Sequence, residues 1–189
     1  LVAGFSERED DLLYNSSVLV GPEGVIGKFR KLHLFIDEKD IFEPGNLGLP
    51  VFDIGICKVG MLVCFDWVFP EAWRILALKG ADVICHPSNL VLPYAQQAVP
   101  VHAMCNRIYA VTCNRTGTEK DLTFTGQSII ANPKGEVLSR AGVDDETISI
   151  VDVDIAAARD KGITARNDVF GDRRTDVYAS LVAENQEGN

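Results

Sequence analysis

A stretch near the middle of the chain, residues 59–89, constrains the fold more than any other part of the sequence. Residues 59–63 are apolar, which predicts a buried strand, and they lead into Cys64 and a short aromatic and acidic segment. Pro70 then opens a helical pattern that ends near Gly80, as expected for a proline in the first turn and a glycine after the last. A second buried-strand pattern follows. This order of strand, sharp bend, helix and strand is typical of a crossover within an α/β sheet.

The cysteine at the bend is a candidate nucleophile. Backbone N–H groups and the dipole at a helix N-terminus favour a thiolate over a thiol, so we expect a lowered pKa for Cys64. A thiolate in such a position can attack an electrophilic carbon. The alternative is a small buried apolar side chain at a strand end, which is the role of most free cysteines.

The flanking segments predict both hairpins and helical crossovers. A hairpin is expected over residues 12–31, a helix over 95–106, a buried strand over 107–113 and a second hairpin over 123–139. A last strand is expected at 147–154. Because hairpins and crossovers alternate, the sequence predicts an α/β layered sandwich with a mixed sheet.

Composition excludes several classes of function. The chain has 189 residues, of which 47% are hydrophobic, so it can build one core. Its formal net charge of −9 argues against nucleic acid as a partner, and no apolar run approaches the roughly 20 residues of a membrane span. The five cysteines contain no Cys-x-x-Cys spacing, which favours reduced thiols. We therefore expect a soluble, cytoplasmic protein without a membrane partner.

Several segments, in the order in which they occur, resemble the nitrilase or carbon–nitrogen hydrolase superfamily, closest to its thermophilic-type nitrilases and aliphatic amidases. They are FRKLHLF, EPG, GMLVCFDWVFPEAWRILALKGADVI, HPSNLVLPYA, NRIYAVTCNRTG and GQSIIANPKGEVL. The resemblance implies a four-layer α-β-β-α sandwich with mixed sheets, and a hydrolase domain over residues 1–161. It also implies a homodimer or larger homo-oligomer contacted by the tail, residues 162–189. The family's first strand and helices would lie ahead of Leu1.

The resemblance also assigns the reacting groups. It implies that Cys64 is the nucleophile, that Lys31 lies beside it, and that Glu38 is the glutamate in the loop after that lysine. The family's proton-relaying glutamate would lie upstream of Leu1, and Glu7 matches a different family position. Attack on an amide or nitrile carbon needs a thiolate, donors for the developing negative charge and a carboxyl group to carry a proton. No metal or cofactor is required.

Three further residues are expected to bind substrate. The backbone N–H of Phe65 is a candidate second donor for the developing charge, Trp67 is expected to line the acyl pocket, and Asn89 to border it. The alternative for Trp67 is an ordinary core or interface aromatic. The three histidines are too scattered in the sequence to predict a zinc site, and no H-E-x-x-H motif occurs.

The sequence therefore predicts a cysteine-dependent hydrolase of non-peptide C–N bonds. Its substrate would be a small aliphatic amide or nitrile, converted to a carboxylate and ammonia through a thioester or thioimidate on Cys64. Taken alone, Lys31 would be a solvated charge at a strand end, and only the resemblance indicates a site residue. The alternative for Glu38 is a solvated charge on the face of a loop. The alternative function is a non-catalytic or truncated nitrilase-fold protein that serves in assembly, whereas a serine hydrolase is excluded because no G-x-S-x-G motif occurs.

Overall fold

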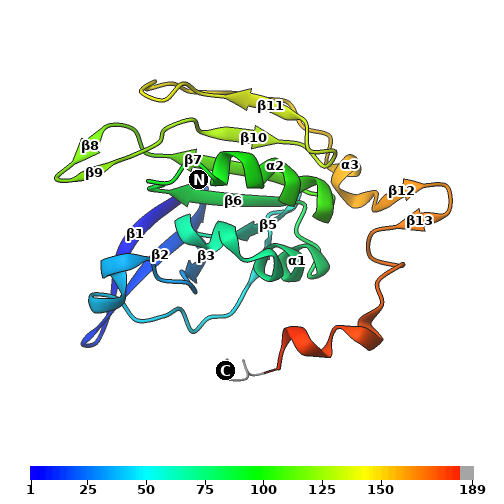
Figure 1. Ribbon diagram of the computed structural model, residues 1–189, viewed down its shortest axis with the longest axis horizontal. Coiled ribbons are helices and arrows are strands. Elements are labelled where there is room, and N and C mark those ends of the chain that lie inside the picture. The colour runs from blue at the N-terminus through cyan, green and yellow to red at the C-terminus, as the bar shows by residue number, and fades with distance from the viewer. Residues whose placement is uncertain (184–189) are drawn as a thin grey trace, which may run out of the picture.

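The computed structural model describes residues 1–183, and it begins with a three-stranded antiparallel sheet (Figure 1). Its strands are β1 (Val2–Glu9), β2 (Leu12–Gly21) and β3 (Gly24–Arg30), paired in the order β1-β2-β3. The hairpin between β2 and β3 turns at Gly24, where φ is 119°. This backbone conformation favours glycine, because it has no Cβ to clash with the chain. The predicted hairpin over residues 12–31 is confirmed.

A second, mixed sheet of six strands forms the centre of the protein. The strand order is β11-β10-β7-β6-β5-β4, with β5, β6 and β7 parallel and the remaining pairs antiparallel. The strands are β4 (Val51–Asp53), β5 (Lys58–Met61), β6 (Val83–Ser88), β7 (Tyr109–Asn114), β10 (Ile129–Ala131) and β11 (Val137–Arg140).

Two helices make the crossovers between the parallel strands. Helix α1 (Pro70–Leu78) joins β5 to β6, and α2 (Ala95–Asn106) joins β6 to β7. Both lie over the mixed sheet in Figure 1. Helix α2 has the bounds expected from the sequence, and it ends at Arg107, whose φ of 50° stops the helical hydrogen bonding.

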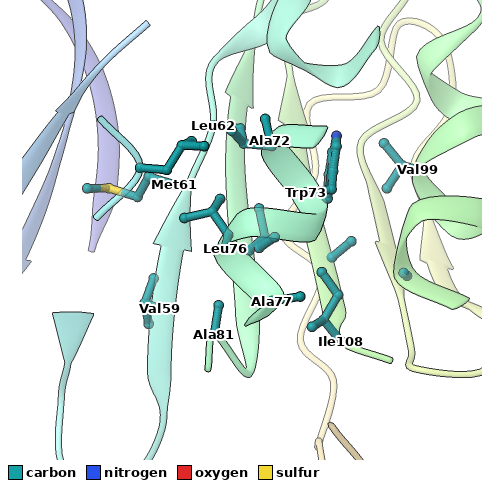
Figure 2. Packing of buried hydrophobic residues seen from close by; sticks show 14 of the residues in the cluster. Val59, Met61, Leu62, Ala72, Trp73, Leu76, Ala77, Ala81, Val99 and Ile108 are labelled. Atoms are coloured by element: carbon teal, nitrogen blue, oxygen red, sulfur yellow. The ribbon is translucent and has the colours of Figure 1, made fainter. Parts of the chain in front are cut away.

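The two faces of β5 bury different partners. Gly60 faces α1, and a Cβ at this position would lie 3.1 Å from a methyl carbon of Leu76. Met61 points the other way, where its sulfur accepts a hydrogen bond from the hydroxyl of Ser17 in β2. Figure 2 shows Leu76 and its apolar neighbours packed against this strand. At β5 the mixed sheet therefore lies between helix α1 and the three-stranded sheet.

The predicted α/β class with mixed sheets is confirmed, and three of the four expected layers lie within the described residues. Small elements complete the chain. They are η1 (Ile36–Asp40), η2 (Cys64–Val68), β8 (Thr118–Glu119), β9 (Leu122–Thr123), α3 (Ile155–Arg159), β12 (Gly162–Thr164), β13 (Asn167–Asp168), η3 (Thr175–Val177) and η4 (Ala179–Leu181). No helix within residues 1–183 is long and apolar enough to cross a membrane.

The strand expected at residues 147–154 is not observed. The segment has no ladder partner among residues 1–183, and the side chain of Ile148 is 90% exposed. An apolar alternation specifies a strand only when a neighbouring strand can take its hydrogen bonds, so the sequence pattern alone was misleading here. The expected C-terminal tail is described as far as residue 183, and its last six residues lie outside the described part.

Truncation of Leu76 tests this packing. Leu76→Ala removes a fully buried side chain between α1 and β5, so we expect a loss of about 2 to 5 kcal/mol in the free energy of unfolding. Urea denaturation followed by circular dichroism measures it. Leu122→Ala, at a half-exposed site in the β8–β9 hairpin, is the matched control and should change stability by less than about 1 kcal/mol. Equal losses for the two variants would contradict this packing.

Candidate active site

Cys64 begins the 3-10 turn η2, which two residues separate from the end of strand β5. Its φ is 46°, the left-handed region, which costs a non-glycine residue roughly 1 to 2 kcal/mol. The fully buried carboxylate of Asp66 stabilises the turn by accepting the backbone N–H of Val63 at 3.0 Å. Helix α1 starts after this turn, at Pro70. The thiol therefore lies at a strained bend, as expected from the sequence.

Lys31 and Glu38 form a largely buried ion pair. The ammonium group of Lys31, which follows β3, is completely buried and donates to the carboxylate of Glu38 in η1. The same carboxylate accepts the backbone N–H of Phe35 and the side-chain amide of Asn15, each at 2.8 Å. Burial of a charge is tolerated when hydrogen bonds compensate for the lost water, and these two donors add to the lysine in stabilising the Glu38 carboxylate.

The environment of the Cys64 thiol favours its neutral form. Burial raises the pKa of Cys64, the positive charge of Lys31 opposes this effect, and the negative charge of Glu38 adds to it. The thiol also lies 3.6 Å from the backbone oxygen of Asn89, to which it donates. The expected lowering of the Cys64 pKa is therefore wrong. The loss of solvation outweighs the favourable charge and backbone dipoles, and sequence patterns do not measure this term.

A small hollow opens above the thiol. Its volume is about 230 Å³ including the space that opens to solvent, and none of its lining side chains is charged. The lining residues are Phe35, Cys64, Phe65, Trp67, Asn89, Leu90, Val91 and Leu92. The structure thus brings Phe65, Trp67 and Asn89 to the same hollow as the cysteine. Phe35 connects it with the ion pair, because its backbone N–H is bonded to Glu38.

Glu7 belongs to a separate charge cluster. Its carboxylate accepts the guanidinium of Arg30, the ammonium of Lys28 and the hydroxyl of Ser16, and the hydrogen bond from Arg30 is the main cause that lowers its pKa to about 2. Arg30 is the last residue of β3 and Lys31 follows it, and successive side chains of an extended chain point to opposite faces. Glu7 therefore stabilises the three-stranded sheet and lies apart from the Lys31–Glu38 pair.

Several contributors to the site were missed by the sequence analysis. The carboxylate of Asp66 stabilises the turn that begins with Cys64, and the amide of Asn15 binds Glu38. The turn is also contacted by three histidines: His33, His86 and His102. A polar residue at a buried strand position, such as Asn15 in β2, was an available signal. Within residues 1–183, no group of three or more His, Cys, Asp or Glu side chains is arranged to hold a metal ion.

Comparison with known proteins identifies the family. A sequence model of carbon–nitrogen hydrolases matches residues 1–161, which is most of the chain. The chain belongs to the carbon–nitrogen hydrolase family. A nitrilase from Pyrococcus abyssi is 54% identical over 178 residues, covering 94% of this chain and 68% of the relative. An (R)-stereoselective amidase from a Pseudomonas species is 39% identical, covering 85% and 61%.

Solved structures of carbon–nitrogen hydrolases share this fold. The crystal structure of a carbon–nitrogen hydrolase from Helicobacter pylori superimposes with a TM-score of 0.86 at 28% identity, covering 96% of this chain and 70% of that one. A mutant amidase from a Nesterenkonia species, with a TM-score of 0.72 and 28% identity, carries the acetamide moiety of fluoroacetamide covalently added at its active-site cysteine. That match covers 76% of this chain and 57% of the amidase. The matches thus cover 57% to 70% of the length of these four proteins.

The raised pKa of Cys64 can be tested by alkylation. Because the thiolate reacts and the thiol does not, the iodoacetamide reaction of Cys64 should reach half its limiting rate at a higher pH than in the urea-unfolded chain. Mass spectrometry of the Cys64 peptide across a pH series measures this midpoint. Lys31→Met removes the charge that lowers this pKa and should move the midpoint further upward. A midpoint below that of the unfolded chain would contradict the burial argument.

Proposed function

We propose that this family member is a cysteine-dependent hydrolase that converts a small aliphatic amide or nitrile to a carboxylate and ammonia. The observation that carries the proposal is that Cys64 lines an uncharged hollow together with Phe35, whose backbone N–H is bonded to Glu38 of the Lys31–Glu38 pair. The charges of this pair also act on the Cys64 thiol. Lysine, thiol and carboxylate are the groups needed for attack on such a carbon.

The first half of the reaction forms a covalent intermediate. The Cys64 thiol gives its proton to a carboxylate base, and the sulfur attacks the substrate carbon. The resemblance assigns this base to a glutamate upstream of Leu1. For an amide, the carbonyl oxygen becomes an oxyanion that accepts hydrogen bonds from Lys31 and from the backbone N–H of Phe65. The C–N bond then breaks, the nitrogen takes the proton and leaves as ammonia, and a thioester remains on Cys64.

The second half of the reaction restores the thiol. Water attacks the thioester carbon while a carboxylate takes its proton, and the C–S bond breaks to release the carboxylic acid and Cys64. A nitrile substrate instead forms a thioimidate, which adds one water to release ammonia and reach the same thioester. Three donors already occupy the Glu38 carboxylate, so its proposed role is to hold the charge of Lys31 in place.

The lining of the hollow supports an uncharged, aliphatic acyl group. All eight lining residues are uncharged, and five of them are aromatic or leucine side chains: Phe35, Phe65, Trp67, Leu90 and Leu92. A charged acyl chain would lose its hydration here without gaining an ionic partner. The covalent acetamide adduct on the cysteine of the Nesterenkonia amidase supports the same nucleophile and a small ligand at this position.

We also propose a homodimer in a reducing, cytoplasmic setting. Apolar side chains on the outer surfaces of two contacting helices support the dimer: Ile75 and Leu78 on α1, and Val101 and Met104 on α2, are each at least 39% exposed. Such a patch is typical of a protein–protein interface. All five cysteines are free thiols, which supports the reducing setting.

Removal of the nucleophile tests the proposed reaction. Cys64→Ala should lower ammonia release from short aliphatic amides and nitriles by roughly a thousandfold or more, because no other group can form the thioester. A coupled ammonia assay and intact-mass detection of the acyl-enzyme provide the measurements. Cys105→Ala, at an exposed thiol on α2, is the matched control and should retain activity. Undiminished turnover by Cys64→Ala would refute the assignment.

Enlargement of the hollow tests the acyl-binding assignment. Trp67→Ala removes an aromatic wall, so the ratio of kcat/KM for hexanamide to that for acetamide should rise by about tenfold or more. Steady-state ammonia assays with the two amides measure the ratio. Tyr94→Ala, at an exposed aromatic outside the lining, is the control. If the Trp67 and Tyr94 variants shift the ratio equally, Trp67 does not bind the acyl group.

A further inference from the structure

The chain has three histidines, and all three bind the five-residue turn η2 that begins with Cys64. They come from distant parts of the sequence: His33 follows β3, His86 lies in β6, and His102 lies in α2. None of them has a role in the proposed reaction.

His86 binds the backbone of the nucleophile itself. Its Nε2 lies 2.7 Å from the carbonyl oxygen of Cys64, and because a carbonyl can only accept, Nε2 carries the proton and donates it. Nδ1 lies 3.0 Å from the hydroxyl of Thr112, which donates to it. The ring is fully buried, and this burial lowers the pKa of His86 to about 4. The neutral Nε2–H tautomer is therefore held from both sides.

This hydrogen bond fixes the direction of the next backbone N–H. The peptide between Cys64 and Phe65 is planar, and in a trans peptide the C=O and N–H groups point in opposite directions. His86 holds the C=O toward the protein interior, so the N–H of Phe65 is directed away from it. Consistent with this direction, the Phe65 N–H interacts with the Cys64 sulfur and lowers its pKa, against the larger effect of burial.

His102 and His33 hold the remainder of the turn. His102 donates from Nε2 to the carbonyl oxygen of Trp67 at 2.9 Å, and its ring stacks on Trp73 with a centroid distance of 4.8 Å. Trp73, labelled in Figure 2, also meets the ring of His86 edge-on at 5.9 Å. His86 and His102 therefore both pack on the side chain of Trp73.

On the other side, His33 binds Asp66 twice. Its backbone N–H and its Nδ1 lie 3.1 and 2.8 Å from the same carboxylate oxygen, and its ring stacks on Phe69 at 3.4 Å. The carboxylate in turn accepts the N–H of Val63. The turn is thus bound at Cys64, at Asp66 and at Trp67, by side chains from a loop, a strand and a helix.

We propose that the three histidines are positioning residues that keep η2 in its strained conformation, and that His86 does so by fixing the peptide that directs the Phe65 N–H at the developing oxyanion. This inference rests on the proposed function, and it names the side chains that hold the Phe65 N–H in place. The reaction step itself is unchanged: no histidine receives or gives a proton.

The test separates donor geometry from thiol reactivity. His86→Leu removes the N–H donor and should lower kcat for a short aliphatic amide by about 100-fold or more, as the loss of one oxyanion donor does, with a much smaller change in KM. Iodoacetamide alkylation of Cys64 needs no oxyanion donor, so its limiting rate at high pH, where the thiol is fully ionised, should stay within about threefold. His86→Gln can place an N–H near the position of Nε2 and should recover at least tenfold of the lost kcat.

Two results would overturn the proposal. One is a kcat for His86→Leu within about threefold of the original protein. The other is an equal loss of kcat and alkylation rate that His86→Gln does not recover, because this outcome describes general damage to the turn. If the unsubstituted protein releases no ammonia from any amide or nitrile, the proposed function fails instead, and the histidine geometry is then decided by spectroscopy.

The spectroscopic test uses the unsubstituted protein, so it does not depend on a variant that folds. In a sample labelled with ¹⁵N-histidine, the three rings give three sets of correlations at neutral pH. We expect the most solvent-protected ring, His86, to be the neutral Nε2–H tautomer, and Thr112→Val to perturb that set selectively. An Nδ1–H tautomer or a cationic His86 ring at neutral pH would overturn the assignment.

Discussion

The left-handed backbone of Cys64 is the constraint on which the rest of the site depends. A β-strand that continued straight would carry the thiol along the sheet, whereas this bend places it over a hollow between loops. The conformation is unfavourable for a residue with a Cβ, so it persists only because surrounding groups stabilise it. The buried carboxylate of Asp66 and the histidine contacts supply this stabilisation. The strain thus explains why several polar side chains, two of them buried, bind these five residues.

Two buried cations follow one another at the end of β3, and each has its own carboxylate. Arg30 is paired with Glu7 within the three-stranded sheet, and Lys31 is paired with Glu38 beside the thiol. Because each charge is satisfied locally, the lysine keeps a fixed position without an exchange of partners. The thiol nevertheless rests in its neutral form, since burial acts on it more strongly than the nearby lysine does. The proposed attack therefore needs a base to take the thiol proton.

Sequence reasoning identified the elements with strong local signals. The helix at residues 95–106 was predicted with its bounds, and Lys31, Glu38 and Cys64 were grouped by motifs that the fold then brings to one region. The predicted direction of the pKa shift of Cys64 was wrong, because this pKa depends mainly on how much water the surrounding loops exclude from the thiol. The histidines were missed for a related reason: residues 33, 86 and 102 meet only when three elements pack together.

The opposed side chains of Arg30 and Lys31 have a consequence for folding. Side chains alternate between the faces of a strand, so a slip of β3 by one residue against β2 would exchange the two cations. The guanidinium of Arg30 would then lie on the side that accommodates the ammonium group of Lys31. Glu7 would have Lys31 in place of Arg30 as its neighbour. Such a misaligned hairpin would be electrostatically mismatched on both faces at once. The two ion pairs therefore favour the native register of β3 against β2.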